Sequence, residues 1–165
     1  LFIPDQNLAR YVAEQVPGKH IIIPDGYCPI HDQMRAEEIK KQKELHPEAK
    51  VLAHPECNQQ ILELADYIGS TSGIIDYAAD SSAKEFIIAT ETGVSYGLQA
   101  KRPDAAFYFA ETPPVCEGMK RITLEGIVHV LRTGENEIHV EDVLAGPAGD
   151  TLKRMLELAA EKGRS

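Results

Sequence analysis

A histidine, a proline and a glutamate at positions 54–56 directly follow a short apolar run, Val-Leu-Ala at 51–53. The run suits a strand that is covered on both faces, as in a parallel sheet. Pro55 cannot continue a strand's hydrogen-bond ladder, so we expect the chain to leave the sheet there. Because open α/β sheets bind ligands beyond the carboxyl ends of their strands, His54 and Glu56 stand where acid/base chemistry or metal binding is usually done. The plainer alternative is a loop histidine beside a helix-starting acid.

Polar or metal-binding residues also follow three other predicted strands, at 67–68, 86–89 and 106–109. In chain order these exits carry Ser70-Thr71, Thr-Glu-Thr at 90–92, and Cys116. In a parallel sheet all four exits lie at one edge, and helices that begin there direct free N–H groups at an anion. Helix capping explains any one such site, but four coincident exits favour a shared binding edge.

The strands alternate with helical patterns, which predicts right-handed crossovers and a parallel sheet. The predicted fold class is α/β, a three-layer αβα sandwich with a four-stranded parallel sheet, plus part of a second similar unit. Further strands are predicted at 1–3 and 20–23. Helices are predicted after the cap Asp5, at 32–46, 58–65, 74–80 and 94–101, and after the caps Thr123 and Asp150.

The segments 2–28 and 86–116 repeat one pattern of strand, helix, strand and proline-containing turn, each ending at a cysteine. Similar αβ units that each deliver one cysteine from a strand exit would produce this pattern. We therefore expect three parts. Residues 1–28 would end a truncated αβ unit, 29–116 would form a complete sandwich, and 117–165 would be a helical segment that packs on a neighbouring, missing unit.

The bulk composition excludes several classes of protein. A net charge of −9 over 165 residues, without a basic patch, argues against a nucleic-acid partner. No apolar run is long enough to predict a membrane span, and no signal peptide is recognisable. An odd number of cysteines, three, does not suggest a disulfide framework, so we expect free or metal-bound thiols in a reducing cytoplasm. The first residue, Leu1, is not a start methionine, and we expect sequence to precede it.

The cysteines leave several possibilities open. Cys28 and Cys116 are single residues on turns, without the close Cys-x-x-Cys pairs of zinc ribbons and bacterial ferredoxins. Both could be inert thiols, or they could converge on one cofactor if the repeated units pack about a common axis. Cys57, at a predicted helix start, could complete a three-thiolate site within this chain.

Four motifs together resemble the quinolinate synthase family, in order along essentially the whole chain. They are His-Pro-Glu-Cys at 54–57, Gly-Ser-Thr-Ser-Gly at 69–73, Ala-Thr-Glu-Thr-Gly-Val at 89–94, and Cys-x-x-Met-Lys-x-Ile-Thr-Leu from Cys116. The resemblance implies three αβ sandwiches about a pseudo-threefold axis, with one cysteine from each holding a 4Fe–4S cluster. It implies a transferase of NAD biosynthesis that joins iminoaspartate to dihydroxyacetone phosphate, with loss of phosphate and water, to give quinolinate.

The resemblance also implies roles for individual residues. Cys28 and Cys116 would ligate the cluster, whereas Cys57 would not. His54 and Glu56 would bind substrate and transfer protons. The substrate-binding residues implied are His54, Pro55, Glu56, Ser70, Thr71 and His31.

The family is about twice this length, and the chain resembles its C-terminal half. The third cluster cysteine would then lie in the missing N-terminal half, so we expect the chain alone to be inactive. Two alternatives remain. One is a zinc-dependent hydrolase or lyase that uses His54 and Glu56 with His31 or Cys28, and the other is a non-catalytic αβ module that binds an anion.

Overall fold

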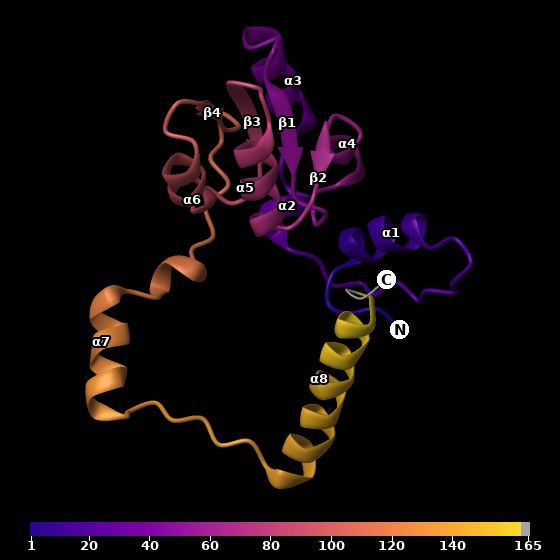
Figure 1. Cartoon of the computed structure of the whole chain (residues 1–165), viewed down its shortest axis with the longest axis vertical. Helices are drawn as coiled ribbons and strands as arrows, with labels where there is room; N and C mark the ends of the chain where they lie inside the picture. The colour runs from indigo at the N-terminus through magenta and orange to yellow at the C-terminus, as the bar shows by residue number, and fades with distance from the viewer. Residues whose placement is uncertain (163–165) are drawn as a thin grey trace. The chain divides into compact units, whose positions relative to one another are not determined.

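Four short strands form a parallel sheet at the centre of the first part of the chain. In the computed structural model, which describes residues 1–162, these are β1 (Lys50–Ala53), β2 (Tyr67–Ile68), β3 (Glu85–Ala89) and β4 (Ala106–Tyr108). Their order across the sheet is β2-β1-β3-β4, and every neighbouring pair is parallel (Figure 1). The predicted four-stranded parallel sheet is confirmed.

Helices cover both faces of this sheet because successive strand residues point to opposite sides. One face packs on α3 (Ala36–Leu45) and α4 (Gln59–Leu62), through Val51, Ala53, Ile87 and Ala89. The other face packs on α5 (Thr71–Asp80) and α6 (Val94–Lys101), through Leu52, Phe86 and Ile88. All seven of these strand side chains are buried, which explains why the strands are apolar on both faces. The predicted three-layer αβα arrangement is confirmed.

The helix predicted over 32–46 is wrong in its extent. The chain instead forms α2 (Pro29–Asp32) and, after a break, α3. The side-chain amide of Asn58 donates to the backbone carbonyls of Asp32 and Met34, at 2.8 Å each. Because these carbonyls find their partner in another element, the backbone of the break is satisfied without a continuous helix.

The predicted strands at 1–3 and 20–23 are also wrong. The two segments flank α1 (Gln6–Gln15) and share one backbone hydrogen bond, from the amide of Phe2 to the carbonyl of Ile22. Leu1, Ile3 and Ile22 are exposed. An isolated pair of extended segments buries too little apolar surface to form a stable ladder, even though its residue types favour one.

Residues 118–165 form a second compact unit, described here up to residue 162. It contains a short 3₁₀ turn, η1 (Met119–Arg121), followed by α7 (Leu124–Thr133) and α8 (Asp142–Lys162). Thr123 caps α7 as predicted. The predicted start of the last helix at Asp150 is wrong, because α8 begins eight residues earlier and runs through Pro147.

The chain divides into two compact units, Leu1–Glu117 and Gly118–Ser165. The finer division at residue 28, and the expected packing of the tail on a missing unit, stay predictions. Within residues 1–162, no helix combines the length and the apolar composition needed to cross a membrane.

Candidate functional site

The exits of three neighbouring strands are joined by backbone hydrogen bonds at one edge of the sheet. The amide of His54, just after β1, donates to the carbonyl of Ala89, the last residue of β3, at 3.0 Å. The amide of Gly69, just after β2, donates to the carbonyl of Ala53 at 3.1 Å. The parallel topology therefore brings these polar exits to one edge, as the strand pattern predicted.

A cysteine, a histidine and a carboxylate meet at this edge. Cys28 Sγ lies 3.2 Å from His31 Nδ1, and His31 Nδ1 lies 3.3 Å from Glu56 Oε2. The three potential ligand atoms all lie within 4.8 Å of one another. His31 is buried, whereas Cys28 and Glu56 are partly exposed. This group can bind a metal ion, because thiolate, imidazole and carboxylate are all common ligands.

Hydrogen bonds orient the two imidazoles at this site. His31 Nε2 lies 2.9 Å from the hydroxyl of Thr90, which can donate or accept. When Nε2–H donates to that hydroxyl, His31 Nδ1 keeps a free lone pair facing Cys28 and Glu56, as metal binding requires. The amide of Glu56 donates to His54 Nδ1 at 3.3 Å, which leaves the proton of that ring on Nε2. The two rings are stacked with their centroids 4.6 Å apart. His54 therefore keeps an N–H donor with which it can bind a substrate oxygen.

Burial shifts the proton affinities of this cluster. Burial, with a smaller contribution from the neighbouring His54, lowers the pKa of His31 to about 4. Burial also lowers the pKa of His54. It raises the pKa of Glu56, and the nearby charge of Asp5 acts in the same direction. Both imidazoles are therefore neutral at neutral pH. The pKa of the carboxylate and those of the imidazoles lie closer together than in water, which favours proton transfer between them.

Cys116 is linked to this edge through Glu91. The buried carboxylate of Glu91 accepts a hydrogen bond from the amide of Cys116 at 3.3 Å, and Glu91 directly follows Thr90, the partner of His31. The residues next to the two cysteines, Pro29 and Val115, also line one pocket of about 180 Å³. The chain thus brings the neighbourhoods of Cys28 and Cys116 together.

The other predicted site residues have plainer surroundings. Ser70 is exposed, and its hydroxyl caps α5 by accepting a hydrogen bond from the amide of Gly73 at 3.2 Å. Thr71 is exposed at the first position of α5, and Pro55 is buried. Within residues 1–162, no side-chain hydrogen bond joins Ser70 or Thr71 to the group around Glu56. Their role in substrate binding stays a prediction.

Cys57 is unlike the other two cysteines. It is fully buried, and its thiol donates to the carbonyl of Ala89 at 3.3 Å. Burial strongly raises the pKa of this thiol, so the thiolate form needed for metal binding is disfavoured. Its burial and its hydrogen bond to Ala89 therefore argue against Cys57 as the third ligand of a three-thiolate site within this chain.

The sequence reasoning missed the support given by three residues. The side-chain amide of Asn7 donates to the carboxylate of Asp32 at 2.8 Å and to the backbone carbonyl of Glu56 at 3.1 Å. Thr90 orients His31, and Asp5 holds the backbone of Cys28. Thr90 was visible as a polar strand exit, but Asn7 left no signal, because it reads as an ordinary helix residue.

Comparison with known proteins identifies the same family that the sequence motifs indicate. Residues 1–157 match the family model described as NadA, Quinolinate synthetase A protein. The chain is 45% identical to a quinolinate synthase of Caldicellulosiruptor saccharolyticus over 159 residues, which is 96% of this chain and 52% of that protein. It is 46% identical to the quinolinate synthases of Clostridioides difficile and Fusobacterium nucleatum, over 96% of this chain and 52% and 53% of those proteins.

The chain thus spans about half the length of the curated relatives it matches. These shares agree with the expected half length. That the half is the C-terminal one stays a prediction.

Proposed function

Because the chain belongs to the quinolinate synthetase A protein family, we propose that it is part of a quinolinate synthase. The whole enzyme would join iminoaspartate to dihydroxyacetone phosphate, with loss of phosphate and water, to give quinolinate for NAD synthesis. One observation carries the proposal. Cys28, His31 and Glu56 meet at the strand exits and connect through Thr90 and Glu91 to Cys116. The cytoplasm remains the expected location.

The chemistry of the donors fits a 4Fe–4S cluster that is held in part by this chain. Cys28 and Cys116 are free, partly exposed thiols, and clusters of this type are held by cysteine thiolates. A third cysteine would come from sequence outside this chain. When bound, a cluster with one iron open to ligands supplies Lewis-acid chemistry.

The chain's own residues would bind substrate and move protons. Glu56 is partly exposed and carries a raised pKa, which suits a general acid/base that must both take and give a proton. The Nε2–H of His54 would donate to a substrate oxygen. Ser70 and Thr71, at the N-terminus of α5, would bind a carboxylate or phosphate of the substrate.

The first test is iron and acid-labile sulfide analysis of the longer protein, purified without oxygen. Cys116→Ala should abolish the iron–sulfur absorbance, because a ligand is lost. Cys57→Ala is the matched control, since it removes a buried thiol that we place outside the ligand set, and it should keep the iron. Full iron content in Cys116→Ala would remove that residue from the ligand set.

A second test concerns the role of Glu56. Glu56→Gln should keep the iron content but lower kcat by about 10²–10⁴-fold, the usual contribution of a positioned general acid/base. Glu63→Gln, on the exposed end of α4, is the control and should turn over normally. Near-normal turnover by Glu56→Gln would exclude it from the mechanism. The present chain alone should form no quinolinate.

A zinc site is the second candidate function, and the group Cys28, His31 and Glu56 favours it. Three protein ligands of these types with an open fourth position describe many catalytic zinc centres. Metal analysis separates the two candidates. Stoichiometric zinc without sulfide would support a zinc hydrolase or lyase, whereas iron with sulfide would reject it.

A further inference from the structure

Asp5 accepts two hydrogen bonds, one from a residue near in the sequence and one from a residue far along it. Its Oδ1 accepts from the amide of Leu8, which caps α1, and its Oδ2 accepts from the amide of Cys28, both at 2.8 Å. The residue is 3% exposed. One buried carboxylate therefore fixes both the start of a helix and the backbone of a cysteine 23 residues later.

Glu91 repeats this arrangement in the other half of the sequence repeat. Its Oε2 accepts from the amide of Gly93 at 2.7 Å, at the start of α6, and its Oε1 accepts from the amide of Cys116 at 3.3 Å. It is 8% exposed, and the cysteine that it holds lies 25 residues further along. Each candidate cluster ligand is thus held at its backbone by a buried carboxylate from the preceding strand exit or turn.

Helix capping alone does not require a buried charge. Asn58, Ser70 and Thr123 cap α4, α5 and α7 with uncharged side chains. Burying a carboxylate is unfavourable unless its oxygens are well hydrogen-bonded. The bond to the cysteine amide is what distinguishes Asp5 from these ordinary caps, and Glu91 makes the same kind of bond although it is not the N-cap residue of α6.

We propose that Asp5 and Glu91 are positioning residues that hold the backbone of Cys28 and Cys116 so that both thiolates can reach one metal cofactor. This inference rests on the proposed function for the identity of the cofactor. The hydrogen bonds themselves can be tested separately, because the amide protons of the two cysteines report on them in this chain without any metal.

The first experiment measures hydrogen exchange at the cysteine amides of this chain. Asp5→Ser keeps a good capping side chain for α1 but is too short to hold Cys28 as well, so exchange at the Cys28 amide should accelerate about tenfold. Exchange at the Cys116 amide should not change. Glu91→Gln should give the reverse pattern.

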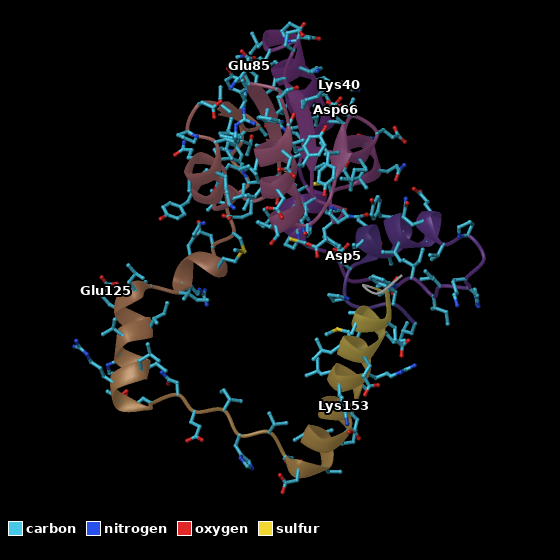
Figure 2. All side chains as sticks on the ribbon, in the orientation of Figure 1. Asp5, Lys40, Asp66, Glu85, Glu125 and Lys153 are labelled. Atoms are coloured by element: carbon cyan, nitrogen blue, oxygen red, sulfur yellow. The ribbon has the colours of Figure 1, made fainter. Side chains whose placement is uncertain are left out.

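Asp66→Asn provides a matched control. Asp66 also accepts from a backbone amide, that of Val51 at 2.8 Å, but it lies near the amino ends of the strands, whereas Asp5 lies beyond their carboxyl ends (Figure 2). Its replacement should accelerate exchange at Val51 and at neither cysteine. Unchanged exchange at both cysteine amides in Asp5→Ser and Glu91→Gln would overturn the inference.

The second experiment uses the longer protein with its cofactor. Removing a negative charge beside a cluster raises its reduction potential, so Asp5→Asn and Glu91→Gln should shift the potential upward, and Asp66→Asn should not. Wild-type protein without iron and sulfide would overturn the proposed function and the cofactor role together. A wild-type cluster whose potential and iron content are unchanged in both variants would overturn the positioning role alone.

Discussion

Glu38 on α3 holds the segment that leads from β4 to Cys116. Its buried carboxylate, on a residue that is 6% exposed, accepts from the amide of Thr112 at 2.9 Å and from the hydroxyl of Thr112 at 3.0 Å. Arg35 also pairs with it, one helical turn earlier. We predict that Glu38→Gln destabilises the folded chain, because a neutral side chain with one oxygen replaces the charged carboxylate that accepts from both the amide and the hydroxyl of Thr112.

The structure sets the size of this effect. A hydrogen bond to a charged group contributes about 1.5–3 kcal/mol to the unfolding free energy, and because Thr112 is exposed and its freed donor can bind water, the loss should lie at the low end of this range. The pair with Arg35 adds little, because that side chain is 66% exposed and its charge is screened by water. Thr112, rather than Arg35, should therefore account for most of the loss.

The loss should depend on pH in a defined direction. The amide of Thr112 holds the pKa of Glu38 below its ordinary value of 4.5, and burial opposes this only in part. Between the folded and unfolded pKa values the unfolded chain binds the extra proton, so stability rises with pH there. The contribution of Glu38 is thus complete above pH 4.5 and is lost as the pH falls through the lowered pKa of the folded state.

Urea unfolding of this chain at pH 7 and at decreasing pH below about 4.5 tests both the size and the sign. The difference between wild type and Glu38→Gln should be largest at pH 7 and should shrink in acid. Glu111→Gln is the matched control, since Glu111 is exposed and pairs with the exposed Lys41. Equal losses in the two variants, or a difference that is constant with pH, would refute the reasoning.

Two further predictions use the same chain. Gly26→Ala should destabilise the chain, because a Cβ would lie 2.6 Å from the carbonyl oxygen of Pro4. Gly18→Ala is the control, since its Cβ meets open space, and it should change the unfolding free energy by less than about 1 kcal/mol. Equal unfolding midpoints for the two variants would contradict this prediction. Iodoacetamide should modify Cys28 but not the fully buried Cys57 in the native chain, as read by peptide mass analysis, and labelling of Cys57 without denaturant would show that its burial is wrong.

The sequence predicted the sheet well because burial on both faces leaves a strong local signal. The apolar runs that became β1 and β3 are bounded by proline or polar residues, and the predicted helix at 94–101 matches α6 in both ends. The predicted capping roles of Asp5 and Thr123 were also local and correct. Parallel pairing then followed from the alternation, and with it the shared edge of His54 and its neighbours.

The failures of the sequence reasoning share a different cause. Residues 1–3 and 20–23 have the composition of strands, but within residues 1–162 no strand of the sheet pairs with them, and the two segments share one backbone hydrogen bond. The start of α8 was missed because Gly146-Pro147 reads as a break, whereas the carbonyl of Glu141 already accepts from the amides of Leu144 and Ala145 and begins the helix upstream. The composition of a segment indicates which secondary structure it can adopt, but the elements that pack against it determine whether that structure forms.

The exit loops are fixed by side chains that each already have a local explanation. Asn58 caps its own helix and also holds the backbone of α2, while Asp5 caps α1 and also holds Cys28. Glu38 reads as a charge on a solvated helix face, yet it is buried against Thr112, 74 residues away. When a local role already explains a residue, its second hydrogen bond to a distant residue goes unnoticed. A single sequence shows the same residue type whether or not the distant bond exists. Substitutions that keep the local role and remove the distant one, such as Asp5→Ser, are therefore the variants that separate the stability of the fold from the geometry of the site.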